Sequence, residues 1–147
     1  MIPAEHPCLS AQAHFRYGRI HLPVAPRCNI RCGYCDRRYD CANESRPGVT
    51  SEVISPEAAL DRVERALRLD SRLRVAGVAG PGEPLANPAT LEILRLVRSR
   101  FPGLLLCLST NGLVLSDALP ELLDCGVSTL TVTVNTRSVV CAGHVYR

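Results

Sequence analysis

Residues 19–35 read RIHLPVAPRCNIRCGYC, a strand-like alternation that runs directly into a loop of closely spaced cysteines. Apolar residues at every second position predict a β-strand over 19–24, and Pro26 ends it. The loop that follows carries three thiols: Cys28, Cys32 and Cys35. A [4Fe–4S] cluster is normally held by four cysteine thiolates, so three would leave one iron open to a substrate. The stretch therefore predicts a metal-binding loop at the end of a strand.

A structural zinc site is the alternative for this loop. Zinc usually takes four ligands in two closely spaced pairs, and Cys41 is available as a fourth thiolate. The spacing of the cysteines directly after a strand favours the cluster over zinc.

The composition is that of an ordinary globular domain. The 147 residues are 46% hydrophobic and 21% charged, which suffices for one domain with a core. The net charge is +3 without a basic run, so neither nucleic acid nor an anionic membrane is an expected partner. No apolar stretch approaches the ~20 residues of a membrane span, and no signal peptide is recognisable, so we expect a cytoplasmic protein. In a reducing compartment the eight cysteines indicate metal binding or catalysis rather than disulfides.

Strand and helix patterns alternate along the rest of the chain. Further strands are expected over 73–79, 104–109 and 129–134. Helices are expected to begin at the N-cap residues Ser55, Asn87 and Ser116. Single helices between strands argue for parallel pairing, and about four repeats are too few for a closed barrel. The prediction is an α/β fold, a parallel-stranded partial TIM-type barrel, with its chemistry at the C-terminal ends of the strands.

Polar residues gather at those strand ends. Residues 80–83 read Gly-Pro-Gly-Glu after the second expected strand, where Gly80 and Gly82 let the backbone approach a ligand and the Glu83 carboxylate suits an ammonium group. An ordinary βα turn is the alternative. The third strand runs into Ser109-Thr110-Asn111, a further polar element at the same edge.

The fourth expected strand has a polar face, formed by Thr129, Thr131, Thr133 and Asn135. A polar stripe inside a parallel sheet needs partners, so Thr133 and Asn135 are predicted to contact a cofactor. The simple preference of threonine for strands is the alternative.

Two further residues alternate with apolar neighbours in their strands. His21 faces away from Ile20 and Leu22, and Cys107 faces away from Leu106 and Leu108, so both are predicted to point to a common interior. A hydrogen-bonded core imidazole and a small buried thiol are the alternatives. Cys125 and Cys141 match no motif.

The cysteine loop resembles the signature of the radical S-adenosylmethionine (SAM) enzymes. A narrower resemblance, to the members of that family that build the nitrogenase cofactor, is carried by residues 6–8, 19–26, 39–48, 79–88 and 107–112. The resemblance implies that the open iron binds the amino and carboxylate groups of SAM, and that an electron from the cluster releases a 5′-deoxyadenosyl radical. It also implies that Gly80, Gly82 and Glu83 receive the amino group of the methionine moiety.

The narrower resemblance implies more clusters and a specific reaction. Cys8, His21 and Cys107 would hold one accessory Fe–S cluster, and Cys41 would help to hold another. The family fuses such clusters and inserts a carbide derived from SAM, which forms the precursor of the FeMo-cofactor. The implied partners are Fe–S cluster donors, nitrogenase cofactor-assembly proteins and a reductant protein.

The chain departs from the family pattern after Asn135. We expect one radical SAM core, N-terminal portion, over 1–147, with a cluster loop over 27–50, βα repeats over 51–135 and a divergent tail over 136–147. About four strands would leave an exposed sheet edge, over which the chain could self-associate. A truncated, non-catalytic Fe–S scaffold or carrier is therefore the alternative function.

Overall fold

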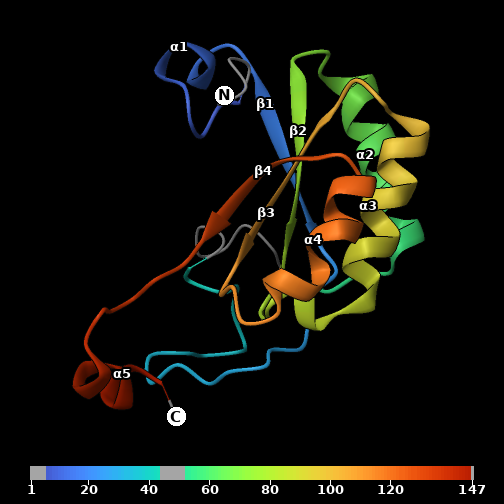
Figure 1. The fold of residues 1–147 in the computed structure, drawn as a ribbon. Coiled ribbons are helices and arrows are strands. Elements are labelled where there is room, and N and C mark those ends of the chain that lie inside the picture. The colour runs from blue at the N-terminus through green and yellow to red at the C-terminus, as the bar shows by residue number, and fades with distance from the viewer. Residues whose placement is uncertain (1–5, 44–51, 147) are drawn as a thin grey trace.

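The computed structural model describes residues 6–43 and 52–146 and contains one parallel sheet (Figure 1). Its strands, in spatial order, are β1 (Gly18–Pro23), β2 (Leu73–Ala79), β3 (Leu105–Thr110) and β4 (Val127–Val132). The predicted α/β class with parallel pairing is confirmed. Parts of the predicted segments, at 1–5, 44–51 and 147, lie outside the described residues.

Three helices cover one face of the sheet, as Figure 1 shows. They are α2 (Pro56–Leu69), α3 (Pro88–Arg100) and α4 (Leu115–Asp124). Two short helices, α1 (Ala11–His14) and α5 (Val139–Val145), and the 3-10 turn η1 (Pro84–Ala86) complete the described elements. The sequence patterns predicted the three long helices and neither of the short ones.

The hydrophobic core lies between the sheet and these three helices. Every second strand residue faces it, and Leu22, Val78 and Leu106 are at most 3% exposed. Val63 of α2 and Ile93 of α3 meet them from the helices, both fully buried. Burying each such side chain stabilises the fold by about 1.5–3 kcal/mol, so the alternation itself fixes which face of the sheet the helices cover.

The opposite face carries the polar residues. His21 lies opposite Gly77, Gly77 opposite Cys107, and Cys107 opposite Thr129, so the four form one row across the sheet. Partners in register on parallel strands point to the same face. The prediction that His21 and Cys107 share one face of the sheet is therefore confirmed.

Of the three predicted helix starts, two are confirmed and one is wrong: Ser55 and Asn87 stand at the N-cap positions of α2 and α3. The Ser55 side chain accepts a hydrogen bond from the backbone N–H of Ala58, as an N-cap does. Ser116, by contrast, lies inside α4, whose N-cap position is Val114, without a side-chain cap. Gly112, at φ +80°, makes a turn in which its carbonyl accepts from the N–H of Leu115, and the helix begins at Leu115, one residue before Ser116.

The last strand is shifted relative to the prediction. β4 ends at Val132, so Thr133 and Asn135 lie beyond the strand rather than on it. One edge of β4 is unpaired within the described sheet, and Val132 is 43% exposed. None of the helices in the described part of the chain combines the length and apolar character that crossing a bilayer requires.

Candidate functional site

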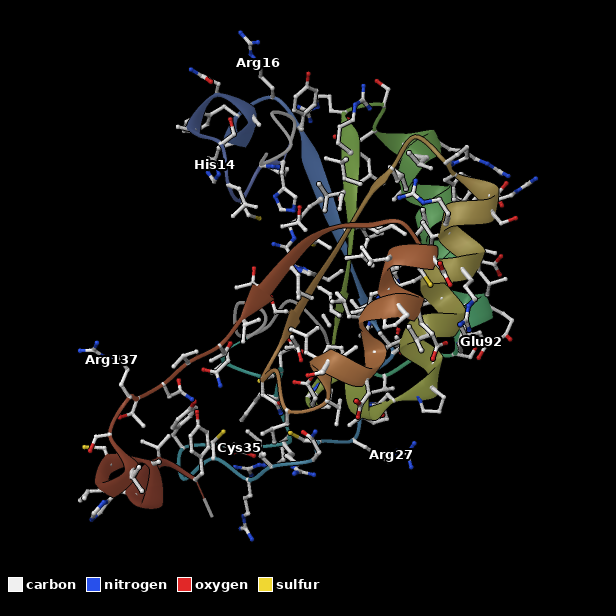
Figure 2. All side chains as sticks on the ribbon, in the orientation of Figure 1. His14, Arg16, Arg27, Cys35, Glu92 and Arg137 are labelled. Carbon is white, nitrogen blue, oxygen red and sulfur yellow. The ribbon has the colours of Figure 1, made fainter. Side chains whose placement is uncertain are left out.

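A pocket of about 230 Å³ opens beside the C-terminal ends of the strands. It brings together five residues of the cysteine loop, Cys28, Cys32, Cys35, Asp40 and Cys41, with polar residues that follow β2, β3 and β4, namely Glu83, Asn111 and Thr133. Figure 2 shows Cys35 and Arg27 at this end of the molecule, and His14 and Arg16 at the other. The strand ends thus meet the cysteine loop where a parallel α/β fold places its chemistry.

The three loop thiols lie close enough to affect one another. Burial raises the pKa of Cys32, a hydrogen bond with Tyr34 lowers it, and the neighbouring Cys35 and Cys28 raise it again. Crowded thiolates repel one another, so a bound cation would hold all three deprotonated. The donor set therefore fits an iron-containing group, for which thiolates are the preferred ligands.

The described side chains do not form a ready-made site for a single metal ion. Within residues 6–43 and 52–146, no three His, Cys, Asp or Glu side chains are gathered as one metal ion requires. The fit of the loop to a cluster rests on the shared pocket and on the chemistry of the thiols.

Two arginine side chains of the loop are engaged with the loop itself. Arg37 donates to the carbonyl of Ile30 at 3.0 Å, and Arg38 pairs with Asp36 at 2.6 Å. Hydrogen bonds from Arg38 lower the pKa of Asp36 to about 2, so this carboxylate is charged at neutral pH.

Glu83 is a pocket-wall carboxylate that is 2% exposed and accepts three hydrogen bonds. Its Oε1 accepts from Thr110 Oγ1 at 2.5 Å and from the N–H of Leu85 at 3.2 Å. Its Oε2 accepts from the N–H of Asn111 at 2.7 Å. A carboxylate has about four acceptor positions, so one is left for a ligand.

The two glycines of this turn approach the chain before the cysteine loop. A methyl group at Gly82 would lie 2.1 Å from the carbonyl oxygen of Arg27, and one at Gly80 would lie 2.5 Å from that of Ala25. Gly80 also has φ +146°, a conformation that side chains rarely adopt. In this structure the glycines bring the turn against the backbone at 25–27, and the pocket itself is lined by Pro81 and Glu83.

The other predicted pocket residues divide into two groups. Asn111 and Thr133 line the pocket, and the N–H of Thr133 donates to the carbonyl of Thr110 at 2.9 Å. Ser109 pairs with Thr131 inside the sheet and is not part of the pocket lining. Asn135 lies outside the lining, where its amide donates to the hydroxyls of Tyr34 and Tyr146.

Cys41 belongs to the pocket of the loop cysteines, whose lining includes neither Cys8 nor Cys107. It lines the pocket with the three loop cysteines, and its N–H donates to the carbonyl of Gly80 at 3.0 Å. The loop therefore presents four thiols to one cavity.

A second polar group lies on the sheet face, away from the pocket. Cys107 stands beside Gly77, and Arg19 donates to Cys8 Sγ at 2.7 Å. Burial raises the pKa of the Cys107 thiol to about 11, with Arg19 lowering it and Cys8 raising it. The structure thus brings Cys8 and Cys107 into electrostatic contact through Arg19, on the face that His21 shares.

Sequence reasoning missed two residues of this second group. Arg19 and His6 carry side-chain nitrogens, Nε and Nε2, that are buried without a hydrogen-bond partner among the described residues. Burial and the charge of Arg19 lower the pKa of His6, which is 2% exposed. The alternation that placed His21 on the polar face also places Arg19 there, so the signal was present in the sequence.

Comparison with known proteins assigns a family to most of the chain. The radical SAM superfamily pattern matches residues 22–139. The solved structure of BtrN, described as a complex with AdoMet and 2-DOIA, aligns with a TM-score of 0.59 over 84% of this chain and 47% of that one. At 18% identity this likeness shows the fold alone, and it fits a partial TIM-type barrel.

Several curated relatives are much closer in sequence, and all carry the description FeMo cofactor biosynthesis protein NifB. Those of Klebsiella pneumoniae and Chlorobaculum tepidum are both 53% identical, over 97% and 88% of this chain. The Klebsiella oxytoca sequence is 53% identical over 73% of this chain and 79% of its own length. The chain spans 31% of the length of the first two relatives.

Proposed function

The chain belongs to the radical SAM superfamily and, within it, to the NifB family, and on this premise we propose that it binds a [4Fe–4S] cluster and SAM in FeMo-cofactor biosynthesis. The observation that carries the proposal is the pocket that collects Cys28, Cys32 and Cys35 beside Glu83. Membership of the superfamily implies both groups, and the pocket supplies soft ligands and a carboxylate side by side.

Each pocket residue takes a role in this proposal. The three loop thiolates hold the cluster, which when bound supplies the electron that cleaves the sulfonium bond of SAM. Glu83 offers its remaining acceptor position to the ammonium group, in a turn shaped by Gly80 and Gly82. Asn111 and Thr133, which line the pocket, are proposed as further cofactor contacts, whereas Ser109 and Asn135, which its lining does not include, stay predictions.

The second polar group is proposed to hold an accessory Fe–S cluster on Cys8, His21 and Cys107. The row across the sheet supports this assignment, because Gly77 leaves space where a side chain would meet Cys107 Sγ at 2.8 Å. Cys41 is proposed to contribute to another accessory cluster, from the wall of the first pocket.

We propose the complete reaction of FeMo-cofactor precursor formation for the longer relatives and for this chain. It fuses the accessory clusters and inserts a carbide from a SAM methyl group. The corresponding partners are cluster donors, cofactor-assembly proteins and a reductant, met in the cytoplasm. The radical SAM core of this proposal comprises the cluster loop 27–50, the repeats 51–135 and the tail 136–147.

Self-association over the unpaired β4 edge is a further proposal, and sedimentation of a stable monomer would contradict it.

Anaerobic reconstitution with iron and sulfide tests the proposal. We expect about four irons per chain from the loop alone, and about twelve with both accessory sites filled. Cys28→Ala should abolish the loop cluster, whereas Cys141→Ala, an exposed cysteine of α5, should leave it unchanged. Reduction in the presence of SAM should release 5′-deoxyadenosine.

Two outcomes favour the alternatives. One zinc per chain, with neither iron nor sulfide, would overturn the proposal in favour of a structural zinc module. An intact cluster that is transferred to an acceptor, without any cleavage of SAM, would identify a non-catalytic scaffold.

A further inference from the structure

The Asn87 side chain makes a two-sided contact with the backbone at Arg27. Asn87 Oδ1 accepts from the N–H of Arg27 at 3.1 Å, and Asn87 Nδ2 donates to the carbonyl of Arg27 at 2.8 Å. The same Nδ2 donates to the carbonyl of Glu83 at 2.7 Å. Asn87 is 5% exposed, and its bond to the carbonyl of Glu83 is buried.

Asn87 occupies a position at which its side chain would ordinarily do something else. It stands at the N-cap of α3, where asparagine usually accepts from a helix N–H, yet it makes no such bond. The N-cap serines of α2 and α5, Ser55 and Ser138, do make it. The amide of Asn87 is instead committed to a segment sixty residues earlier in the chain.

That segment leads directly into the cysteine loop. Arg27 precedes Cys28, and its carbonyl also accepts from the N–H of Glu83 at 2.9 Å. The N–H of Gly82 donates to the carbonyl of Ala25 at 2.9 Å. The backbone on the way to the first thiol is therefore fastened to the turn that carries Glu83, and Asn87 closes this connection from the start of α3.

We propose that Asn87 is a positioning residue, which fixes the backbone at Arg27 so that the Cys28 thiol and the Glu83 carboxylate keep a set separation in the pocket. The inference rests on the proposed function for the identity of the bound groups. Asn87 touches neither group itself, and it acts through Arg27 and Glu83.

Three variants test this role. Asn87→Ala removes all the contacts, and Asn87→Asp keeps the size but sets a carboxylate oxygen against the carbonyls of Arg27 and Glu83. The matched control is Thr90→Val. Thr90 is fully buried and donates to the carbonyl of Pro84 at 2.7 Å, in the same turn, without touching Arg27.

The first measurement uses the metal-free chain. Amide exchange at Arg27, followed by NMR, should be about tenfold faster in Asn87→Ala, which removes the oxygen that accepts from this N–H. Thr90→Val should leave this exchange within about twofold of the wild-type rate. Equal exchange in Asn87→Ala and the wild type would overturn the proposal.

The second measurement uses the anaerobically reconstituted chain. Both Asn87 variants should release iron to a chelator about tenfold faster than the wild type, as the loss of hydrogen bonds predicts. Their electron paramagnetic resonance spectra should also differ from that of the wild type. Thr90→Val should match the wild type in both. If Thr90→Val changes them equally, Asn87 is merely structural and the proposal fails. If the wild type binds no iron, the proposed function fails, and the exchange measurement still decides whether Asn87 positions Arg27.

Discussion

The backbone N–H of Asn111 donates to Oε2 of Glu83 at 2.7 Å, and this bond joins the ends of β3 and β2 at the wall of the pocket. Thr110 and Leu85 occupy the other oxygen of the same carboxylate. Glu83 therefore acts as a connection between strand ends as well as a candidate ligand contact. A buried carboxylate with this many donors is held in one orientation.

Glu83→Gln should destabilise the fold as well as weaken SAM binding. The amide would place an NH₂ group where one oxygen now accepts, so at least one buried N–H or O–H would lose its partner. We expect a loss of about 1–3 kcal/mol in the free energy of unfolding, measured by urea denaturation of the metal-free chain. Glu92→Gln, on the exposed side of α3 (Figure 2), is the control and should change it by less than about 0.5 kcal/mol. A Glu83→Gln variant as stable as the control would contradict this account.

Gly82→Ala should be far more damaging than a glycine replacement elsewhere. Its methyl group would lie 2.1 Å from the carbonyl oxygen of Arg27, a backbone atom that cannot turn aside. Gly103→Ala is the matched control, because nothing lies within 4 Å of its added methyl group. The free energy of unfolding should fall by about 3 kcal/mol or more for Gly82→Ala and by less than about 1 kcal/mol for the control. The measurement compares the midpoints of thermal unfolding of the two variants. Similar midpoints would show that the turn does not pack against 25–27.

Much of the sheet was predictable because its two faces differ in polarity. The bounds of β2 were predicted residue for residue, and the shared face of His21 and Cys107 follows from period-two alternation. The start of α2 was predictable because a serine, a proline and an acid occupy its first positions. These signals are local, and local signals are what a single sequence carries well.

Long-range polar contacts were not predictable in the same way. Asn87 has the sequence signature of an N-cap, but its side chain contacts Arg27 instead, which only the packed fold makes possible. The glycines of the Gly-Pro-Gly-Glu turn were expected to approach a ligand, whereas in this structure they approach the preceding chain. α5 was missed because it is only seven residues long and none of them is buried, so it carries no pattern of buried and exposed positions.

Cys125 and Cys141 should differ sharply in reactivity. Cys125 is 2% exposed, and burial raises its pKa above the ordinary 9.0, so at neutral pH it is a protonated thiol. Cys141 is exposed on α5. Because the thiolate is the nucleophile, iodoacetamide should label Cys141 at least about tenfold faster than Cys125 in the folded chain, as read by mass spectrometry.

The raised pKa of Cys125 also predicts how the stability of the fold depends on pH. The folded state keeps the Cys125 proton while the unfolded chain loses it, so stability should fall as the pH rises above the ordinary value. Cys125→Ala should remove that part of the alkaline decline. Equal labelling of the two cysteines at pH 7 would show that the end of α4 is open to solvent.

Gly77→Ala should disturb the site around Cys107 and leave the cysteine loop of the first pocket unchanged. The new methyl group would lie 2.8 Å from Cys107 Sγ and 3.2 Å from a guanidinium nitrogen of Arg19, so both side chains must move. The first pocket does not include these residues. We expect the loop cluster of about four irons to persist, while any iron beyond it is lost.

The metal-free chain gives a second reading of the same change. Displacing Cys107 from its buried position should speed its alkylation about tenfold or more, because both exposure and thiolate fraction rise. Gly103→Ala again serves as the control and should leave iron content and alkylation unchanged. A variant that loses the loop cluster together with the additional iron would show that the row through His21, Gly77 and Cys107 is coupled to the pocket, and that the two sites are not independent.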